Sequence, residues 1–146
     1  MFRRSFLALL AAAAVAAALP AAAQAQPVPV RIRVIKGSRQ GPPHMDPRLA
    51  DQKRQLSALA YQRWEQIDER NLQLQPGKPQ FVTIPGGDDG AVTLQEQRGQ
   101  TVTIEVGVVA RNTQSTLTVE KGQRIVHQVS PERNGAAFFL TVLAWP

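Results

Sequence analysis

The chain has 146 residues, with 17 basic and 11 acidic residues, a formal net charge of +6 and no cysteine. This length suits one domain, and the lack of cysteine excludes disulfides, thiolate nucleophiles and thiolate metal ligands. Hydrophobic residues make up 43% of the chain, but many of them are concentrated before residue 26, so the remainder is more polar than the average indicates.

Residues 1–25 have the three parts of a secretory signal peptide. Two adjacent arginines come first, residues 7–19 form an apolar segment without charge, and an Ala-Gln-Ala cleavage sequence ends at Ala25. The apolar segment is shorter than the ~20 residues that span a bilayer. We therefore expect a cleaved signal, no transmembrane segment in the mature form, and a single exported domain, periplasmic or secreted, over residues 26–146.

The arginine pair also resembles the twin-arginine export pattern, because Arg3-Arg4 is followed by Ser5 and two large apolar residues. Only two residues precede the pair, and a small domain with no cofactor motif has little need to fold before export. General secretion is therefore the preferred route, and twin-arginine export remains the alternative.

One strand and one helix open the mature chain. Residues 30–35 alternate apolar and basic side chains, which predicts a half-buried strand with a cationic face. Asp46 and Pro47 are typical residues for the N-cap and first position of a helix, which we expect to end near Ala60. Its apolar stripe consists of Leu49, Leu56 and Leu59.

Residues 61–74 fit either a strand or a second helix. Their side chains alternate in the manner of a strand, but Trp64 and Ile67 would also share one helical face. We favour an extended strand that ends at Leu72-Gln73-Leu74, before a Pro-Gly turn.

The rest of the chain predicts short strands separated by turns. These strands cover residues 80–84, 91–97, 101–110, 115–120, 124–130 and 136–145. The last one is apolar on both faces, so we expect it to be central and covered twice. The predicted fold class is α+β: one amphipathic helix packed on a mainly antiparallel sheet or a small β-sandwich.

Basic residues are concentrated near the start of the mature chain. Without residues 1–25, which contain two arginines and no acid, the net charge falls from +6 to +4. Residues 31–63 alone hold eight basic and two acidic residues. This pattern is typical of a solvated face and of a protected strand edge, but it also suits an acidic envelope protein or an anionic polymer as partner. The candidate contact residues are Arg31, Arg33, Arg39, Arg48, Arg54 and Arg63.

No catalytic, cofactor or metal site stands out. His44 and His127 lack the paired spacing of a zinc site, and no serine lies in a nucleophile elbow. Ser130 follows His127 at a spacing that would place the two side chains on opposite faces of a strand. Nucleic acid is a poor candidate as partner, because the protein is expected to be exported and has no recognition motif.

Two other functional classes stay open. An envelope-polymer hydrolase would require carboxylates such as Asp88, Glu105 and Glu120, or His127, to converge in one cleft. A carbohydrate-binding module would require Trp64 and Tyr61 to lie exposed and coplanar.

The first half of the mature chain resembles a group of small exported bacterial proteins of uncharacterised function. The matching residues run in order: Ile32-Arg33-Val34-Ile35-Lys36-Gly37-Ser38, Gly41, Asp46-Pro47-Arg48-Leu49, Tyr61, Leu72-Gln73-Leu74 and Ile84-Pro85-Gly86-Gly87. These are strand, cap and turn positions, so the resemblance implies fold and location and no functional residue. The favoured function is an exported, soluble, non-catalytic interaction module of the cell envelope, accessory to an envelope or secretion assembly.

Overall fold

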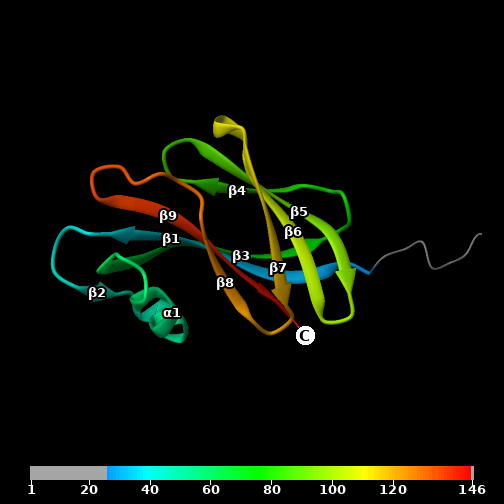
Figure 1. The fold of residues 1–146 in the computed structure, drawn as a ribbon, viewed down its shortest axis with the longest axis horizontal. Coiled ribbons are helices and arrows are strands. Elements are labelled where there is room, and N and C mark those ends of the chain that lie inside the picture. The colour runs from blue at the N-terminus through cyan, green and yellow to red at the C-terminus, as the bar shows by residue number, and fades with distance from the viewer. Residues whose placement is uncertain (1–25, 146) are drawn as a thin grey trace, which may run out of the picture.

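A computed structural model describes residues 26–145 and shows two β-sheets packed face to face (Figure 1). The larger sheet has the strand order β2-β3-β1-β9-β8, and the smaller sheet has the order β4-β5-β6-β7. The predicted signal peptide lies outside the described residues. Within residues 26–145, no helix is long and apolar enough to cross a membrane.

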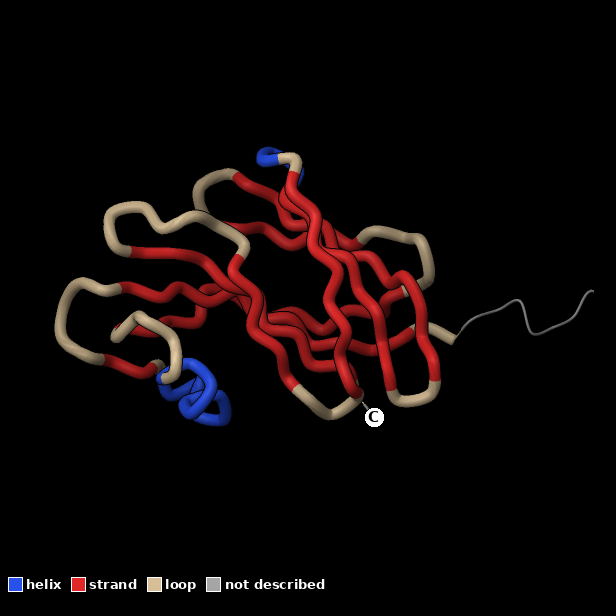
Figure 2. The backbone as a smooth tube through the Cα atoms, viewed as in Figure 1, coloured by secondary structure: helices blue, strands red, loops and turns tan. Residues whose placement is uncertain are grey.

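The strands account for most of the described chain (Figure 2). The larger sheet consists of β1 (Val28–Ser38), β2 (His44–Met45), β3 (Arg63–Leu74), β8 (Arg124–Gln128) and β9 (Ala136–Ala144). The smaller sheet consists of β4 (Gln80–Ile84), β5 (Asp88–Arg98), β6 (Thr101–Val108) and β7 (Thr113–Glu120). The helical segments are η2 (Pro47–Gln52), α1 (Lys53–Ser57) and η3 (Val109–Arg111).

The predicted α+β class is wrong, because the domain is a mostly-β sandwich without a long helix packed on a sheet. The expected helix over residues 46–60 is a six-residue 3-10 helix followed by a five-residue α-helix. Asp46 does cap the first turn, and Leu49 and Leu56 are buried, but Leu59 is 37% exposed. The helix cannot continue beyond Ala60 because the chain from Arg63 onward pairs with β1 along β3.

Two strand predictions are confirmed. Residues 63–74 form β3, which pairs antiparallel with β1 from Ser38↔Arg63 to Val28↔Leu74. The last strand, β9, lies between β1 and β8 and is buried on both faces, as its continuous apolar sequence predicted. Of the two structures considered for residues 61–74, the strand is therefore the correct one.

The two faces of the larger sheet support different apolar clusters. Inward-facing rows such as Val30 and Ile32 of β1 and Leu140 of β9 meet the smaller sheet and form the main core. On the opposite face, Trp64 and Phe139 pack beneath the helical segment in a second cluster. The helical segment thus closes the outer face of one end of the larger sheet and contributes nothing to the core between the sheets.

Candidate cationic hollow

A hollow of about 360 Å³ opens at the end of the sandwich where the inward-facing rows of both sheets run out. It lies between the end of β1, the turn from β4 to β5, the η3 segment and the loop from β8 to β9. Three basic side chains line it: Lys36, Arg111 and Arg133. We call this site the cationic hollow.

Lys36 belongs to the core-facing side of β1. Val30, Ile32 and Val34 point into the core, and strict alternation places Lys36 next in the same row. At this position the row has passed the packed part of the core, and Lys36 is only half-buried. Its ammonium group therefore reaches the hollow, where water or a ligand can meet it.

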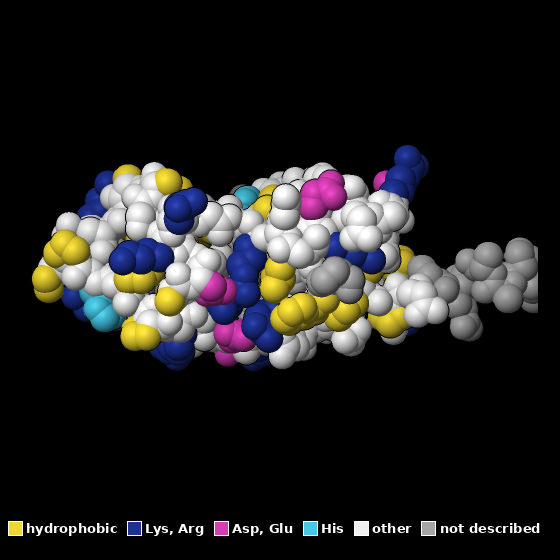
Figure 3. Space-filling model, turned by 90° about the horizontal axis from the view of Figure 1, so that it is seen from below, with side chains coloured by type: hydrophobic (Ala, Val, Ile, Leu, Met, Phe, Trp, Pro, Cys, Tyr) yellow, Lys and Arg dark blue, Asp and Glu magenta, His cyan; other side chains and the backbone are white. Residues whose placement is uncertain are grey.

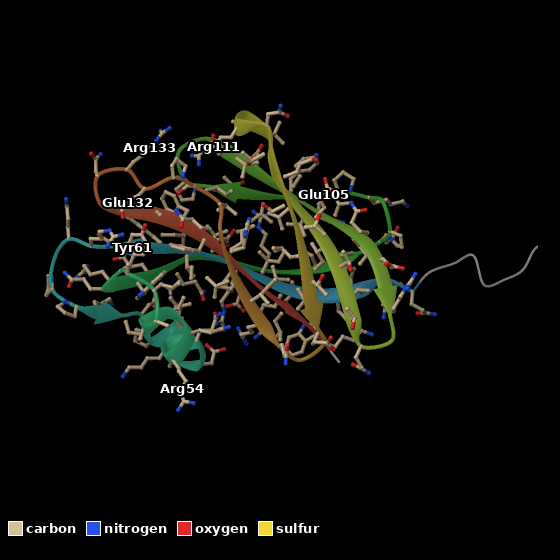
Figure 4. The ribbon with its side chains drawn as sticks, in the orientation of Figure 1. Arg54, Tyr61, Glu105, Arg111, Glu132 and Arg133 are labelled. Carbon is tan, nitrogen blue, oxygen red and sulfur yellow. The ribbon has the colours of Figure 1, made fainter. Side chains whose placement is uncertain are left out.

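Arg111 reaches the hollow from the connection between β6 and β7 (Figure 4). Its Nη2 donates to Oδ2 of Asp88 at 2.8 Å, and its Nη1 donates to the carbonyl oxygen of Val129 at 3.3 Å. Both paired side chains are mostly shielded, at 23% and 18% exposure. Arg111 thus links the smaller sheet to the end of β8, and Asp88 neutralises one of the three cations.

Arg133 is held by a tight turn in the loop before β9. Its backbone N–H donates to the carbonyl oxygen of Ala136 at 2.8 Å, and Ala136 N donates back to Arg133 at 3.0 Å. The same loop is tied to the β1–β2 loop, because Arg39 N donates to the carbonyl oxygen of Gly135 at 2.8 Å. The exposed Arg133 guanidinium is therefore carried by a fixed backbone.

A second contact reinforces this wall. The Arg39 guanidinium binds the carboxylate of Glu132 and lies 4.8 Å above the ring of Tyr61. The hydrogen bond from Arg39 lowers the pKa of Glu132, while burial raises the pKa of the Tyr61 hydroxyl. Glu132 thus forms its ion pair with Arg39 beside the hollow and is not among the lining residues of the hollow.

The charge of the hollow is not balanced internally. Within residues 26–145, neither Lys36 nor Arg133 forms an ion pair, and Asp88 is the one acidic residue in the lining. The remaining polar lining residues are Ser38, Gln40, Ser130 and Asn134. Two uncompensated cations with neutral hydrogen-bonding groups around them favour a bound carboxylate or phosphate.

The six arginines predicted to contact an anionic partner do not form one open basic surface. Five of them have carboxylate partners within the domain: Arg31 and Arg33 with Glu69, Arg39 with Glu132, Arg48 with Asp46, and Arg63 with Glu65. On the face drawn in Figure 3, acidic side chains lie among the basic ones. Their contact with a partner stays a prediction.

Arg33 and Arg54 differ most in their exposure to solvent. Arg33 is only 6% exposed and donates at 2.9 Å to both Asp51 and Gln52 of the helical segment, so its role is to attach that segment to the sheet. Arg54 forms no ion pair among the described residues and extends from α1 into solvent (Figure 4). It is also far from the lining of the cationic hollow.

The side chains that a hydrolase would need do not converge. Asp88 is paired with Arg111, whereas Glu105 lies in a separate trough on the outer face of the smaller sheet, beside Phe81. Glu120 is exposed and accepts a hydrogen bond from Thr101. The hydrolase alternative lacks the cleft that it requires among these residues.

His127 and Ser130 both line one slot, and the strand alternation that was expected to place them on opposite faces does not reach Ser130. The reason is that β8 ends at Gln128, and Ser130 therefore lies outside the strand. The Ser130 hydroxyl accepts from Phe138 N at 2.8 Å, and no hydrogen bond joins it to His127 within the described chain. Burial lowers the pKa of His127.

The aromatic pair considered for carbohydrate binding is not a flat exposed platform. Trp64 is 1% exposed, and its ring meets that of Tyr61 edge-on at 76°. Both rings also contact Phe139, so they serve the cluster beneath the helical segment.

Sequence reasoning missed the cationic hollow as a site, although one signal was available. Continuing the alternation of β1 by one step places Lys36 on the core-facing side, where a lysine is unusual unless the core ends there. Arg111 and Arg133 lie in connections, and no local pattern indicates that these connections meet.

Within residues 26–145, no three histidine, aspartate or glutamate side chains are grouped in a way that could hold a metal ion. Comparison of the chain with protein-family models, with curated proteins and with solved structures finds no match.

Proposed function

We propose that the protein is an exported, non-catalytic binding module of the cell envelope, and that it holds a carboxylate or phosphate group of an envelope component in the cationic hollow. The observation that carries this proposal is the pair of uncompensated cations, Lys36 and Arg133, in one concave site with Arg111. The predicted signal peptide supports the location.

The hollow is better suited to binding than the outer arginines are. Most of those arginines already have carboxylate partners, whereas a ligand anion at the hollow replaces water around two free cations. A concave wall also shields the ligand from part of the bulk solvent, which strengthens its attraction to the cations.

The test is titration of the mature protein with inorganic phosphate at low ionic strength, followed by NMR chemical shifts. Lys36→Ala and Arg133→Ala should each weaken binding by roughly tenfold, since each removes one charge-assisted contact. Asp88→Asn should strengthen binding, because it removes the carboxylate in the lining. Arg54→Ala is the matched control: it removes an equal charge outside the hollow and should leave binding unchanged.

Two results would contradict the proposal. Unchanged phosphate affinity in Lys36→Ala and Arg133→Ala would show that the hollow does not bind anions. An equal loss in Arg54→Ala would show that phosphate responds to overall charge and has no defined site.

A further inference from the structure

A second hollow, of about 330 Å³, continues from the cationic hollow along the open side of the sandwich. It lies between β7 and β8, the edge strands of the two sheets, and we call it the lateral slot. The lining of both hollows includes Arg111, Ser130 and Pro131. The two hollows therefore adjoin at Arg111, whose guanidinium is bonded to Asp88 and to the carbonyl oxygen of Val129.

The lateral slot exists because β7 carries small side chains where the core would need large ones. The inward-facing side chains of β7 change in size along the strand. Leu117 and Val119 pack into the core, whereas Thr113 and Ser115, at the start of the strand, are small and polar. Ser115 pairs with Val106 of β6, and Thr113 pairs with Val108. The two valines thus lack a bulky partner on β7 and lie at the base of the slot, where they are 2% and 4% exposed.

The rim of the slot differs from its floor. Val129 adds a third valine to the lining, while His127 and Gln128 of β8 stand opposite Thr113 and Ser115 of β7. No acidic residue lines the slot. An apolar chain fits the floor, and its charged end would then lie beside Arg111, Lys36 and Arg133.

We infer that the ligand is an anionic amphiphile, with its carboxylate or phosphate in the cationic hollow and an adjoining short apolar chain in the lateral slot. The inference rests on the proposed function, because the anionic group is the one assigned there. It adds that the ligand carries hydrocarbon directly next to its charge, as the end of a lipid does and as a free phosphate ion or a uniformly charged polymer does not.

The experiment compares methyl phosphate with butyl phosphate and hexyl phosphate on the mature protein. Each methylene that enters the slot should tighten binding about fourfold. Butyl phosphate, but not methyl phosphate, should shift the methyl NMR signals of Val106, Val108 and Val129. Propanoate and hexanoate form a parallel series, and tightening with chain length in either series supports the inference.

A pair of variants on β7 locates the apolar chain. Ser115→Phe fills the slot and should abolish the advantage of butyl over methyl phosphate while leaving methyl phosphate binding intact. Thr116→Phe is the matched control, because Thr116 is exposed on the opposite face of the same strand. The valine signals of the unmodified protein give the answer even if Ser115→Phe does not fold.

The outcomes separate this inference from the proposed function. If no phosphate ester or carboxylate binds, the proposed function fails. If methyl phosphate binds but longer chains bind no tighter and leave the valine signals unmoved, the amphiphile is wrong and the anion site stands. If an apolar tripeptide with a free carboxylate binds more tightly than butyl phosphate, the amphiphile inference is also wrong, and the partner is a peptide.

Discussion

Asp46 is the residue on which the start of the helical segment depends. Its Oδ1 accepts from Arg48 N at 3.0 Å, and its Oδ2 accepts from Gln66 N at 3.0 Å and from Arg48 Nη2 at 2.8 Å. The carboxylate therefore joins the helical segment to β3 across 20 residues of chain. The hydrogen bond from the Arg48 side chain, followed by those from the two backbone N–H groups, holds the pKa of Asp46 well below its ordinary value.

Asp46→Asn should lower the free energy of unfolding by about 1–3 kcal/mol at neutral pH, because an amide nitrogen would replace one of the two accepting oxygens. The folded pKa is depressed, so the contribution is present above the ordinary value of 3.8 and is lost as the pH falls through the folded value. Denaturant titrations should therefore show that the difference in the free energy of unfolding between the variant and the unmodified protein shrinks as the pH falls below 3.8.

The control is Asp68→Asn, whose carboxylate is 40% exposed on the neighbouring part of β3. Its effect should stay within about 0.5 kcal/mol. A loss for Asp46→Asn that persists undiminished in acid would contradict the assignment of the effect to the ionised carboxylate.

At the scale of elements, the helical segment acts as a cover for the outer face of the larger sheet. Leu56 is fully buried in the cluster with Trp64 and Phe139, while Leu59, one turn further on, is 37% exposed. Leu56→Ala should cost about 2–5 kcal/mol in the free energy of unfolding, since it leaves a cavity beneath the helical segment.

Leu59→Ala makes the same chemical change at the exposed end of the stripe and should cost about 0.5 kcal/mol. Denaturant unfolding followed by tryptophan fluorescence measures both. Equal losses for the two variants would contradict the assignment of the Leu56 effect to packing in the buried cluster.

The sequence predicted the stripe better than it predicted the length of the helix. Apolar spacing identified Leu49 and Leu56 correctly, because residues on the buried face of a helical turn recur at a regular spacing in the local sequence. The end of the helix depends on pairing between β1 and β3, which lie more than 20 residues apart at their nearest ends. Gln52 shows the same limit: it is buried, and its Oε1 accepts from Arg33 of β1, a partner that helical spacing does not indicate.

The sequence could not locate the cationic hollow for a similar reason. Counting charges found a basic N-terminal half, but it could not show that Arg31, Arg33 and Arg39 meet carboxylates from Glu69, Asp51 and Glu132. The cationic hollow is assembled from four separate parts of the chain. Only Lys36 could have been placed from the sequence, through the alternation of β1.

At the scale of the whole molecule, the first and last strands lie side by side. Val30 of β1 pairs with Ala144 of β9, and Trp145 N donates to the carbonyl oxygen of Pro29 at 3.1 Å. The pairing of β1 with β9 thus joins segments about 100 residues apart in the chain. A short Gly-Ser linker can connect these ends, which makes circular permutation a direct test of the architecture.

New ends between Gly99 and Gln100 lie in the turn from β5 to β6, which does not line the cationic hollow. This permutant should unfold cooperatively in denaturant and bind phosphate as the unpermuted protein does. New ends between Gly86 and Gly87 place a terminal carboxylate on Gly86, which does line the hollow. That permutant should fold but bind phosphate more weakly, because the added negative charge opposes the anion. Equal phosphate binding by both would separate the anion site from this end of the sandwich, and failure of the first to fold would contradict the adjacency of β1 and β9.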